Sequence, residues 1–510
     1  MTMIRASRLH RRYHHDDLLL SQQSSIHSSY YNSTMSEQEQ QQAMLRDQED
    51  KKAIVLSVLR SQCKPESPFE ALRSIGAILE EHPDALICQV LSGGKTNYSY
   101  KAYIKSNPQL AVFVKVCFPF ALWNPDRSVH YDVVRVENEF RIMKEYQQMI
   151  GPDAPVGTPY FCCDYEGGLK VLGVEWNQAD QQLATQFADG RIDHRWMPQL
   201  ARAIAPLHLR TDYDPDFNDT VRPCMESIFP VLKQLFADKL TGDDPDAVTP
   251  LAQSIGQTAF DAMIDRNVAS YHSREALVHH DLHAFNILCE ADHGPLIAIC
   301  DWEMAFCGPI GGDAGNFLFY PMDCALVHAS LGRKDVAMDL LEAMLEFWDE
   351  YALVLREEGG KDEVFLTQLL KDAMGWAGFK GFAAAYLMHV WDETFPWQDV
   401  PEDEQKKARA AFGCTALKVY QMGFGEGMPE LSYDELRQWL YDTMASDIEA
   451  AFARATELRP RRRSTLRARR ISDASALEEM ACRLSIHSQD RRRSIFDVSL
   501  LAPELGVMVE

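Results

Sequence analysis

The sequence predicts an α+β protein, with a small antiparallel β-sheet part followed by a larger, mainly helical part. Two observations predict this class. Short runs of apolar and β-branched residues lie between positions 86 and 176, and from position 196 onward apolar residues recur at the three-to-four-residue spacing of helices. With 510 residues and a hydrophobic content of 46%, the chain is long enough for one large domain with extensions.

The expected sheet begins near position 86. The first two predicted strands are joined by a short loop, Ser92-Gly-Gly-Lys-Thr-Asn97. Its Gly93 and Gly94 would let backbone N–H groups approach a phosphate closely, because no Cβ obstructs them. The other interpretation is an ordinary hairpin turn. Gly93, Gly94 and Asn97 are therefore candidate nucleotide-binding residues. The four predicted strands are Leu86–Ser92, Tyr98–Ile104, Ala111–Cys117 and Leu169–Trp176.

A lysine, Lys115, interrupts the apolar third strand. Burying an ammonium group in such a strand is costly unless the group meets anions. The phosphates of a nucleotide, together with a glutamate from the next helix, would supply those anions. The predicted helix Val133–Met149 offers two candidates, Glu137 and Glu139. Lys115 is therefore a candidate phosphate-binding residue.

The second part of the chain is expected to be helical. Trp196–Leu209 has an apolar stripe along one helix face. The same spacing predicts helices over Val336–Leu355, Val364–Trp391, Glu404–Met422 and Tyr433–Ala453.

The most informative motif is His279-His-Asp-Leu-His-Ala-Phe-Asn286, which has the form H-x-D-x-x-x-x-N and is followed by Asp301-Trp-Glu303. Phosphoryl transfer from ATP needs a carboxylate that accepts the proton of the attacking hydroxyl, and oxygen ligands for Mg²⁺. Asp281 is the candidate catalytic base, and Asn286 and Asp301 are candidate metal ligands. Three short apolar runs predict a catalytic loop, a hairpin and a metal-binding loop in that order: Ala276–His280, Ile287–Cys289 and Leu296–Cys300.

These residues resemble the aminoglycoside phosphotransferase and choline kinase superfamily, which shares the two-lobed fold of protein kinases. D-W-E stands where a protein kinase has D-F-G, and no A-P-E follows. Gly308-Pro-Ile-Gly-Gly-Asp-Ala-Gly-Asn316, with Ala373–Lys380 and Met388–Val390, is most similar to methylthioribose kinases. The resemblance covers residues 85–425. It implies an ATP- and Mg²⁺-dependent kinase that phosphorylates a hydroxyl group of a small molecule.

The resemblance also implies roles for residues of the helical lobe. Glu303 would add a second carboxylate to the metal site. Asp313 would brace the catalytic loop through the loop's backbone, and His208 would be structural.

In the sheet lobe, the resemblance implies that Glu139 rather than Glu137 pairs with Lys115. The fourth strand would lead into the hinge between the lobes. Backbone groups of Glu175 and Trp176 would then hydrogen-bond the adenine.

One stretch departs from the family. Methylthioribose kinases carry a paired arginine that helps to bind the sugar, where this chain has Phe382-Ala-Ala-Ala-Tyr386. Methylthioribose or a related sugar is the first choice of acceptor. Choline or ethanolamine is the alternative, which an aromatic box of Trp391 and Trp397 would favour. A catalytically silent pseudokinase that binds partners is the alternative from another class, although the lysine, the base and the metal ligands are all present.

Composition excludes several classes. The net charge of −24 argues against a general nucleic-acid or anionic-membrane binder. The 12 cysteines include no C-x-x-C pair, which indicates thiols in a reducing compartment. No uncharged apolar run reaches the length of a membrane span. We therefore expect a cytoplasmic enzyme with a small-molecule substrate, and the sequence leaves a homodimer open.

The domain organisation follows from shifts in composition. We expect a disordered Ser/Gln/His-rich extension over residues 1–60, a sheet lobe over 61–176, a helical lobe over 177–455 and a basic disordered tail over 456–510. The extension begins with four arginines that suggest a mitochondrial presequence, but Asp16 and Asp17 interrupt it. In the tail, arginines precede Ser464, Ser472 and Ser494, which is the pattern that basophilic protein kinases phosphorylate. The other interpretation is a basic tail lying against the acidic body.

Overall fold

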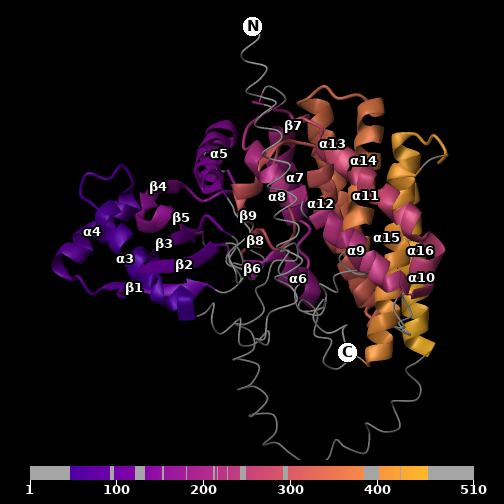
Figure 1. The fold of residues 1–510 in the computed structure, drawn as a ribbon, viewed down its shortest axis with the longest axis horizontal. Helices are drawn as coiled ribbons and strands as arrows, with labels where there is room; N and C mark the ends of the chain where they lie inside the picture. Colours follow the sequence, from indigo (N-terminus) through magenta and orange to yellow (C-terminus); the bar gives the residue numbers. More distant parts are fainter. Residues whose placement is uncertain are drawn as a thin grey trace, which may run out of the picture. The chain divides into compact units, whose positions relative to one another are not determined.

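A computed structural model of the chain describes residues 46–91, 97–120, 132–151, 154–177, 179, 181–210, 213–214, 216–226, 228–241, 249–290, 297–383, 401–425 and 427–457 (Figure 1). These residues form two compact units. The described residues up to Phe140, together with Pro159–Trp176, form the first unit. Arg141–Thr158 and the described residues from Asn177 onward form the second.

The first unit contains a five-stranded antiparallel sheet in the order β1-β2-β3-β5-β4. Lys115 of β3 lies opposite Ser99 of β2 and Leu172 of β5, so it occupies the middle of the sheet. All four predicted strands are present, and the sheet adds one more. The strands are β1 (Leu86–Leu91), β2 (Asn97–Ile104), β3 (Asn107–Cys117), β4 (Pro159–Tyr165) and β5 (Leu169–Glu175).

Two helices, α3 (Lys52–Gln62) and α4 (Glu70–Glu81), share the core of this sheet. Val55 and Leu59 of α3 are fully buried there. The chain before α3 is also anchored, because the Tyr98 hydroxyl donates to Asp47 Oδ2 (2.7 Å). The prediction of disorder up to residue 60 was therefore wrong for its last part. The apolar residues of α3 form a short, nearly continuous run from Ala53 to Leu59, so the sequence shows no clear helical periodicity there.

Helix α5 (Val134–Ile150) belongs to both units. Its first half lies in the first unit, and its second half packs within the second, where the Tyr146 hydroxyl donates to the carbonyl of Ala203 (2.7 Å). The Tyr146 ring also lies against Trp302, with ring centroids 5.0 Å apart. Residues 141–158 therefore belong to the second unit, although they fall within the range 61–176 that was predicted for the sheet lobe.

The second unit is mainly helical, as predicted. Its centre is α12 (Ile310–Ser330), in which Ile310–Ala329 are all buried. At Gly315 an added Cβ would lie 2.6 Å from the carbonyl oxygen of Ala373, so α14 approaches α12 more closely than any side chain would permit. The other long helices are α7 (Trp196–His208), α9 (Ile228–Thr241), α11 (Gln257–Tyr271), α13 (Lys334–Glu357), α14 (Glu363–Phe382), α15 (Glu402–Phe424) and α16 (Tyr433–Glu457). The short helices are α6 (Leu183–Asp189), α8 (Arg222–Glu226) and α10 (Thr249–Ile255).

The predicted helices correspond to α7, α13, α14, α15 and α16. The prediction for α14 extended to Trp391, and its last residues lie outside the described part of the chain. Trp391 and Trp397 of the suggested aromatic box also lie outside it, as does the predicted basic tail beyond Glu457. In the part of the chain that the structure describes, no helix is both long enough and apolar enough to cross a bilayer.

Short strands carry the loops of the second unit. The predicted hairpin is present, because β8 (Ile287–Cys289) pairs antiparallel with β9 (Ile297–Ile299), and β6 (Gln181–Gln182) extends it. Separately, β7 (Ala276–Val278) pairs with β10 (Phe306–Gly308). The loops after β7 and after β9 are therefore fixed at both ends.

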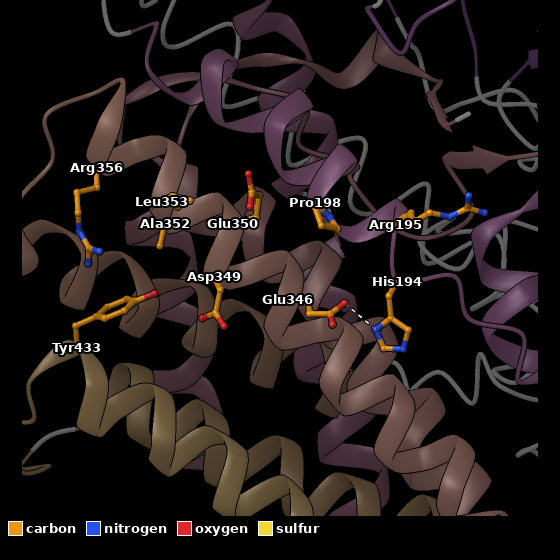
Figure 2. A pocket seen from close by; sticks show the side chains of 10 residues that line it. All are labelled: His194, Arg195, Pro198, Glu346, Asp349, Glu350, Ala352, Leu353, Arg356 and Tyr433. Atoms are coloured by element: carbon orange, nitrogen blue, oxygen red, sulfur yellow. Dashed lines mark hydrogen bonds and ion pairs between the residues drawn. The ribbon is translucent and has the colours of Figure 1, made fainter. Parts of the chain in front are cut away.

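A surface groove of about 660 Å³ lies along α7, α13 and the start of α16 in the second unit (Figure 2). At one end of it, His194 contacts two carboxylates of α13. Its Nε2 is 2.9 Å from Asp339 Oδ1, and its Nδ1 is 2.7 Å from Glu346 Oε2. Burial alone would lower the pKa of His194, but the two carboxylates outweigh it and raise the pKa.

A histidine whose pKa is raised by folding stabilises the fold below its unfolded pKa of about 6.5, and this contribution disappears as the pH rises through the folded value. We expect His194→Gln to lower the free energy of unfolding by at most about 1 kcal/mol at mildly acid pH, because His194 and both carboxylates are partly exposed. The loss should vanish at alkaline pH. Urea unfolding at the two pH values measures this, and equal losses at both would contradict the ion-pair explanation.

Candidate active site

In the first unit, Lys115 and Glu139 form a buried ion pair with Nζ 2.9 Å from Oε2. The lysine is 5% exposed and the glutamate 3%. Two charges at this depth are stabilised only by each other or by further charged groups. Glu137, the other predicted partner, instead contacts Lys170. The structure thus pairs Lys115 with the glutamate that the family resemblance favoured.

Some of the other predicted nucleotide-binding residues of the first unit are described by the structure and some are not. Gly93 and Gly94 lie outside the described residues. Asn97 is buried, and its Oδ1 accepts a hydrogen bond from Arg135 Nη2 (2.9 Å). This contact gives Asn97 a structural role in fixing the start of β2. Glu175 and Trp176 stand at the end of β5, where Lys101 Nζ lies 4.1 Å from the centre of the Trp176 ring.

In the second unit, the loop between β7 and β8 holds the predicted base and a predicted metal ligand together. Asn286 Nδ2 donates to Asp281 Oδ2 and to the Asp281 carbonyl, both at 3.0 Å. The amide nitrogen is thus directed at the base, which leaves the Asn286 oxygen as the atom suited to a cation. His283 Nε2 lies 3.4 Å from Asp281 Oδ1.

The charge state of Asp281 follows from its neighbours. Burial by itself would raise the pKa of Asp281, but His283, Lys380 and His279 lower it, and the result lies below the usual range. The carboxylate is therefore ionised at neutral pH and can accept a hydrogen bond from a hydroxyl group.

Asp313 fixes the backbone of this loop. Its Oδ2 accepts hydrogen bonds from the His279 N–H (2.6 Å) and from His208 Nε2 (3.1 Å), and its Oδ1 accepts from the His280 N–H (2.5 Å). His208 is held in turn by Tyr351, whose hydroxyl lies 2.6 Å from Nδ1. These contacts match the bracing role that the resemblance implied for Asp313 and the structural role that it implied for His208.

The same brace stabilises an uncommon backbone conformation. His280 has a φ of 68°, which is left-handed and costs a residue with a Cβ about 1–2 kcal/mol. Besides the Asp313 contact, Asn316 Nδ2 donates to the His280 carbonyl. The His280 side chain is held by the Tyr271 hydroxyl, 2.7 Å from Nε2. These contacts fix the backbone conformation of the loop, and the fixed backbone determines where the Asp281 side chain points.

The second acidic motif begins directly after β9. Asp301 is left-handed with a φ of 68°, and Glu303 follows in a short 3-10 turn where it is 1% exposed. The Cys300 N–H donates to the Asn286 carbonyl (2.9 Å), which joins the predicted metal-binding loop to the predicted catalytic loop. Asn286, Asp301 and Glu303 offer amide and carboxylate oxygens, which are the ligands that Mg²⁺ prefers. The donor set therefore fits this cation.

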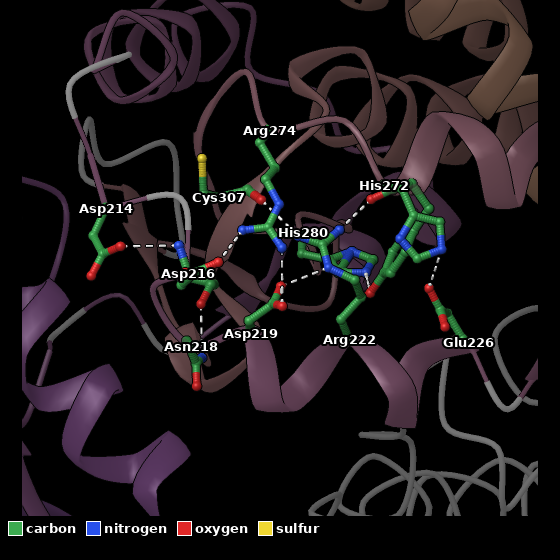
Figure 3. A network of polar contacts seen from close by, with 12 residues as sticks. Asp214, Asp216, Asn218, Asp219, Arg222, Glu226, His272, Arg274, His280 and Cys307 are labelled. Atoms are coloured by element: carbon green, nitrogen blue, oxygen red, sulfur yellow. Dashed lines mark hydrogen bonds and ion pairs between the residues drawn. The ribbon is translucent and has the colours of Figure 1, made fainter. Parts of the chain in front are cut away.

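A polar network that was not predicted from the sequence holds the backbone of residues 303–307, which includes the end of the second acidic motif (Figure 3). Asn218 Nδ2 donates to the carbonyls of Glu303 (3.0 Å) and Ala305 (2.8 Å). Arg222 Nη2 donates to the Cys307 carbonyl (2.9 Å), and Arg222 Nε donates to Asp219 (2.8 Å). Asn218 is buried and left-handed, with a φ of 52°. It is a positioning residue, since it acts on Glu303 through the backbone.

We expect Asn218→Gly to raise the Mg²⁺ concentration needed for half-maximal activity and to lower the free energy of unfolding by about 1–3 kcal/mol, because two buried carbonyls lose a donor. Glycine keeps the left-handed backbone free of strain, so the effect isolates the amide. Titration of activity with Mg²⁺ and urea unfolding measure the two quantities.

The matched control is Asn267→Ala, in which another buried asparagine, bonded to the Met263 carbonyl in α11, is lost. This variant should lose stability but keep the Mg²⁺ dependence of the wild type. An unchanged Mg²⁺ dependence in Asn218→Gly would contradict the positioning role.

Comparison with known proteins agrees with this geometry. The model of the phosphotransferase enzyme family matches residues 89–347, so the chain belongs to that family. It is a kinase that acts on small molecules. It is 23% identical over 327 residues to the methylthioribose kinase of Bacillus velezensis, covering 59% of this chain and 78% of that protein. It is 27% identical over 183 residues to the methylthioribose kinase of Exiguobacterium sibiricum, covering 33% and 44%.

Two solved structures are also similar to this chain. The Plasmodium vivax ethanolamine kinase has a TM-score of 0.38 and 14% identity, covering 70% of this chain and 91% of that one. The aminoglycoside phosphotransferase of Alicyclobacillus acidocaldarius has a TM-score of 0.35 and 12% identity, covering 73% and 96%.

Proposed function

We propose that this protein transfers the γ-phosphoryl group of ATP to a hydroxyl group of methylthioribose or a related sugar, with Mg²⁺ as the metal. The observation that supports it most is the hydrogen-bonded pair of Asp281 and Asn286, joined through Cys300 to the loop that holds Asp301 and Glu303. A base and oxygen ligands at this spacing are the protein groups that phosphoryl transfer from ATP requires.

Each residue has a role in the proposed reaction. Asp281 accepts a hydrogen bond from the acceptor hydroxyl and directs its oxygen at the γ-phosphorus. The new O–P bond forms as the bond from the γ-phosphorus to the β–γ bridging oxygen breaks, and the hydroxyl proton passes to Asp281. Lys115, fixed by Glu139, binds the phosphates. Asn286, Asp301 and Glu303 would hold Mg²⁺, which neutralises the charge on the phosphates.

The choice of a sugar rests on two things. Both relatives named above are methylthioribose kinases, and the Gly308–Asn316 stretch is similar to theirs. Against a strict methylthioribose assignment stands the stretch from Phe382 to Tyr386, which carries no arginine where the family has its arginine pair. This stretch begins with Phe382. Its ring is fully buried against Phe236 and Phe260, so it packs the helical core. A related sugar with different substituents is therefore included in the proposal.

The test is ADP formation by the purified full-length protein with Mg-ATP and a panel of methylthioribose, related pentoses, choline, ethanolamine and aminoglycosides. Acceleration by methylthioribose or a pentose, abolished by a chelator, is the expected result. Acceleration by an amine alone would replace the sugar with a choline-type acceptor. ATP binding without acceleration by any acceptor would contradict the kinase proposal and support a silent binding module.

A further inference from the structure

Lys380 lies in the last turn of α14, and the packing of this helix indicates that its side chain points toward the catalytic loop. The residues on either side of it, Phe379 and Gly381, face other helices. Phe379 lies against Phe229 of α9, and an added Cβ at Gly381 would meet Phe412 of α15 at 2.8 Å. Lys380 therefore points away from α9 and α15.

The turn before Lys380 shows what it faces. Trp376, four residues earlier and so on the same helix face, lines a small enclosed cavity together with His280, Asp313 and Asn316. These three residues belong to the catalytic loop and to its brace on α12. The face of α14 that carries Trp376 and Lys380 is thus the face directed at the catalytic loop.

The charges around Lys380 agree with this placement. Burial lowers the pKa of Lys380 to about 8, although Asp281 and Asp313 act in the opposite direction. In turn, Lys380 contributes to the lowered pKa values of Asp281 and His280. Among the residues that the structure describes, Asp281 and His280 of the catalytic loop and Asp313 of α12 therefore lie near enough to the ammonium to interact with it electrostatically. At neutral pH the lysine is mostly charged.

We propose that Lys380 lines the acceptor site and donates a hydrogen bond to the oxygen next to the hydroxyl that Asp281 orients, which makes the preferred acceptor a neutral vicinal diol. This inference rests on the proposed function and names the residue that selects the acceptor. An ammonium donor beside a carboxylate acceptor is complementary to two adjacent hydroxyl groups, one of which donates while the other accepts. A cationic acceptor such as choline would instead place a like charge beside Lys380, which disfavours its binding.

The experiment compares Lys380→Met and Lys380→Arg with the wild type. Methionine keeps the length of the side chain but removes the charge and the hydrogen-bond donors. Arginine keeps the positive charge and the hydrogen-bond donors. Lys371→Met, earlier on the same helix, is the matched control. Measured quantities are kcat and KM for methylthioribose and ribose, for choline and ethanolamine, and the rate of ATP hydrolysis without an acceptor. Melting curves check that each variant folds.

We expect Lys380→Met to lower kcat/KM for the diols by about 10- to 100-fold, mainly through KM, because one hydrogen bond to a charged donor is lost. Lys380→Arg should retain part of the activity, and Lys371→Met should match the wild type. Hydrolysis of ATP by water should not change, since water needs no contact with Lys380. The ratio of amine to diol phosphorylation should rise in Lys380→Met.

Three results would overturn the inference. These are an unchanged KM for the diols in Lys380→Met, a wild-type preference for choline, and a parallel loss of water-dependent hydrolysis, which would show that Lys380 only holds Asp281 in place. A wild-type protein that phosphorylates no acceptor would contradict the proposed function itself, and the inference with it. A wild-type protein that phosphorylates diols with an unaffected Lys380→Met variant would refute the inference alone.

Discussion

Asp281→Asn is expected to lower kcat for phosphoryl transfer by about 10²- to 10⁴-fold, the usual contribution of a general base. Asparagine has nearly the same shape as aspartate, and its side-chain oxygen can still accept the hydrogen bond from Asn286 Nδ2. It carries no charge and cannot take the proton of the acceptor hydroxyl. Steady-state kinetics with the best acceptor measures the loss, and the affinity for ATP should change little.

The pH profile gives a second measure of the same group. The pKa of Asp281 lies below its usual range, because His283, Lys380 and His279 together outweigh the effect of burial. Asp281 should therefore stay ionised throughout the range in which the protein is assayed, and kcat/KM should show no acid limb from it between about pH 5 and 8.

The matched control is Asp434→Asn, which makes the same substitution at an exposed position of α16. It should leave kcat unchanged. An Asp281→Asn variant that folds and keeps wild-type kcat would refute the assignment of the base.

The sequence predicted those features whose residues are close together in the chain. Asp281 and Asn286 lie in one loop between two short strands, so their spacing alone brings them into contact. Lys115 was found because a charged side chain interrupts an apolar strand. Lys380 carries the same signal, a lysine within an apolar and glycine-rich helical segment, but helices tolerate lysines more readily than buried strands do.

The network around Asn218 could not be predicted in this way. Asn218 is 85 positions from Glu303, and its amide acts on backbone carbonyls that carry no sequence signature. The run Asp214–Asp219 looks like an ordinary polar loop in the sequence. The predicted helices also did not include α12, because its first turns contain several glycines. In the structure these glycines allow α14 to approach closely, and packing rather than helix propensity stabilises that segment.

Asp313→Asn is expected to lower the free energy of unfolding by about 3–5 kcal/mol and to reduce activity strongly, because a buried charged acceptor with several donors is lost. Both carboxylate oxygens are used, by the backbone of His279 and His280 and by His208. Asparagine offers one oxygen, and its NH₂ group would face a backbone N–H. Urea unfolding measures the loss of stability, and steady-state kinetics with the best acceptor measures the loss of activity.

The matched control is on the same helix. Asp323 is also buried in α12, but burial raises its pKa well above the usual value, and in the described part of the structure its Oδ1 has no hydrogen-bond partner. For Asp313, burial would raise the pKa, but His208 lowers it below the usual value. The two carboxyl groups therefore have opposite effects on stability as the pH changes.

The sign follows from proton linkage. Asp313, whose pKa is lowered by folding, stabilises the fold above its unfolded pKa of about 3.9, and that contribution disappears as the pH falls through the folded value. Asp323, whose pKa is raised, must take up a proton on folding at neutral pH, which costs stability. Asp323→Asn should thus be neutral or stabilising at pH 7, where Asp313→Asn is strongly destabilising. If both variants lost the same free energy, burial rather than charge would govern this helix, and Asp313 would not be the brace of the catalytic loop.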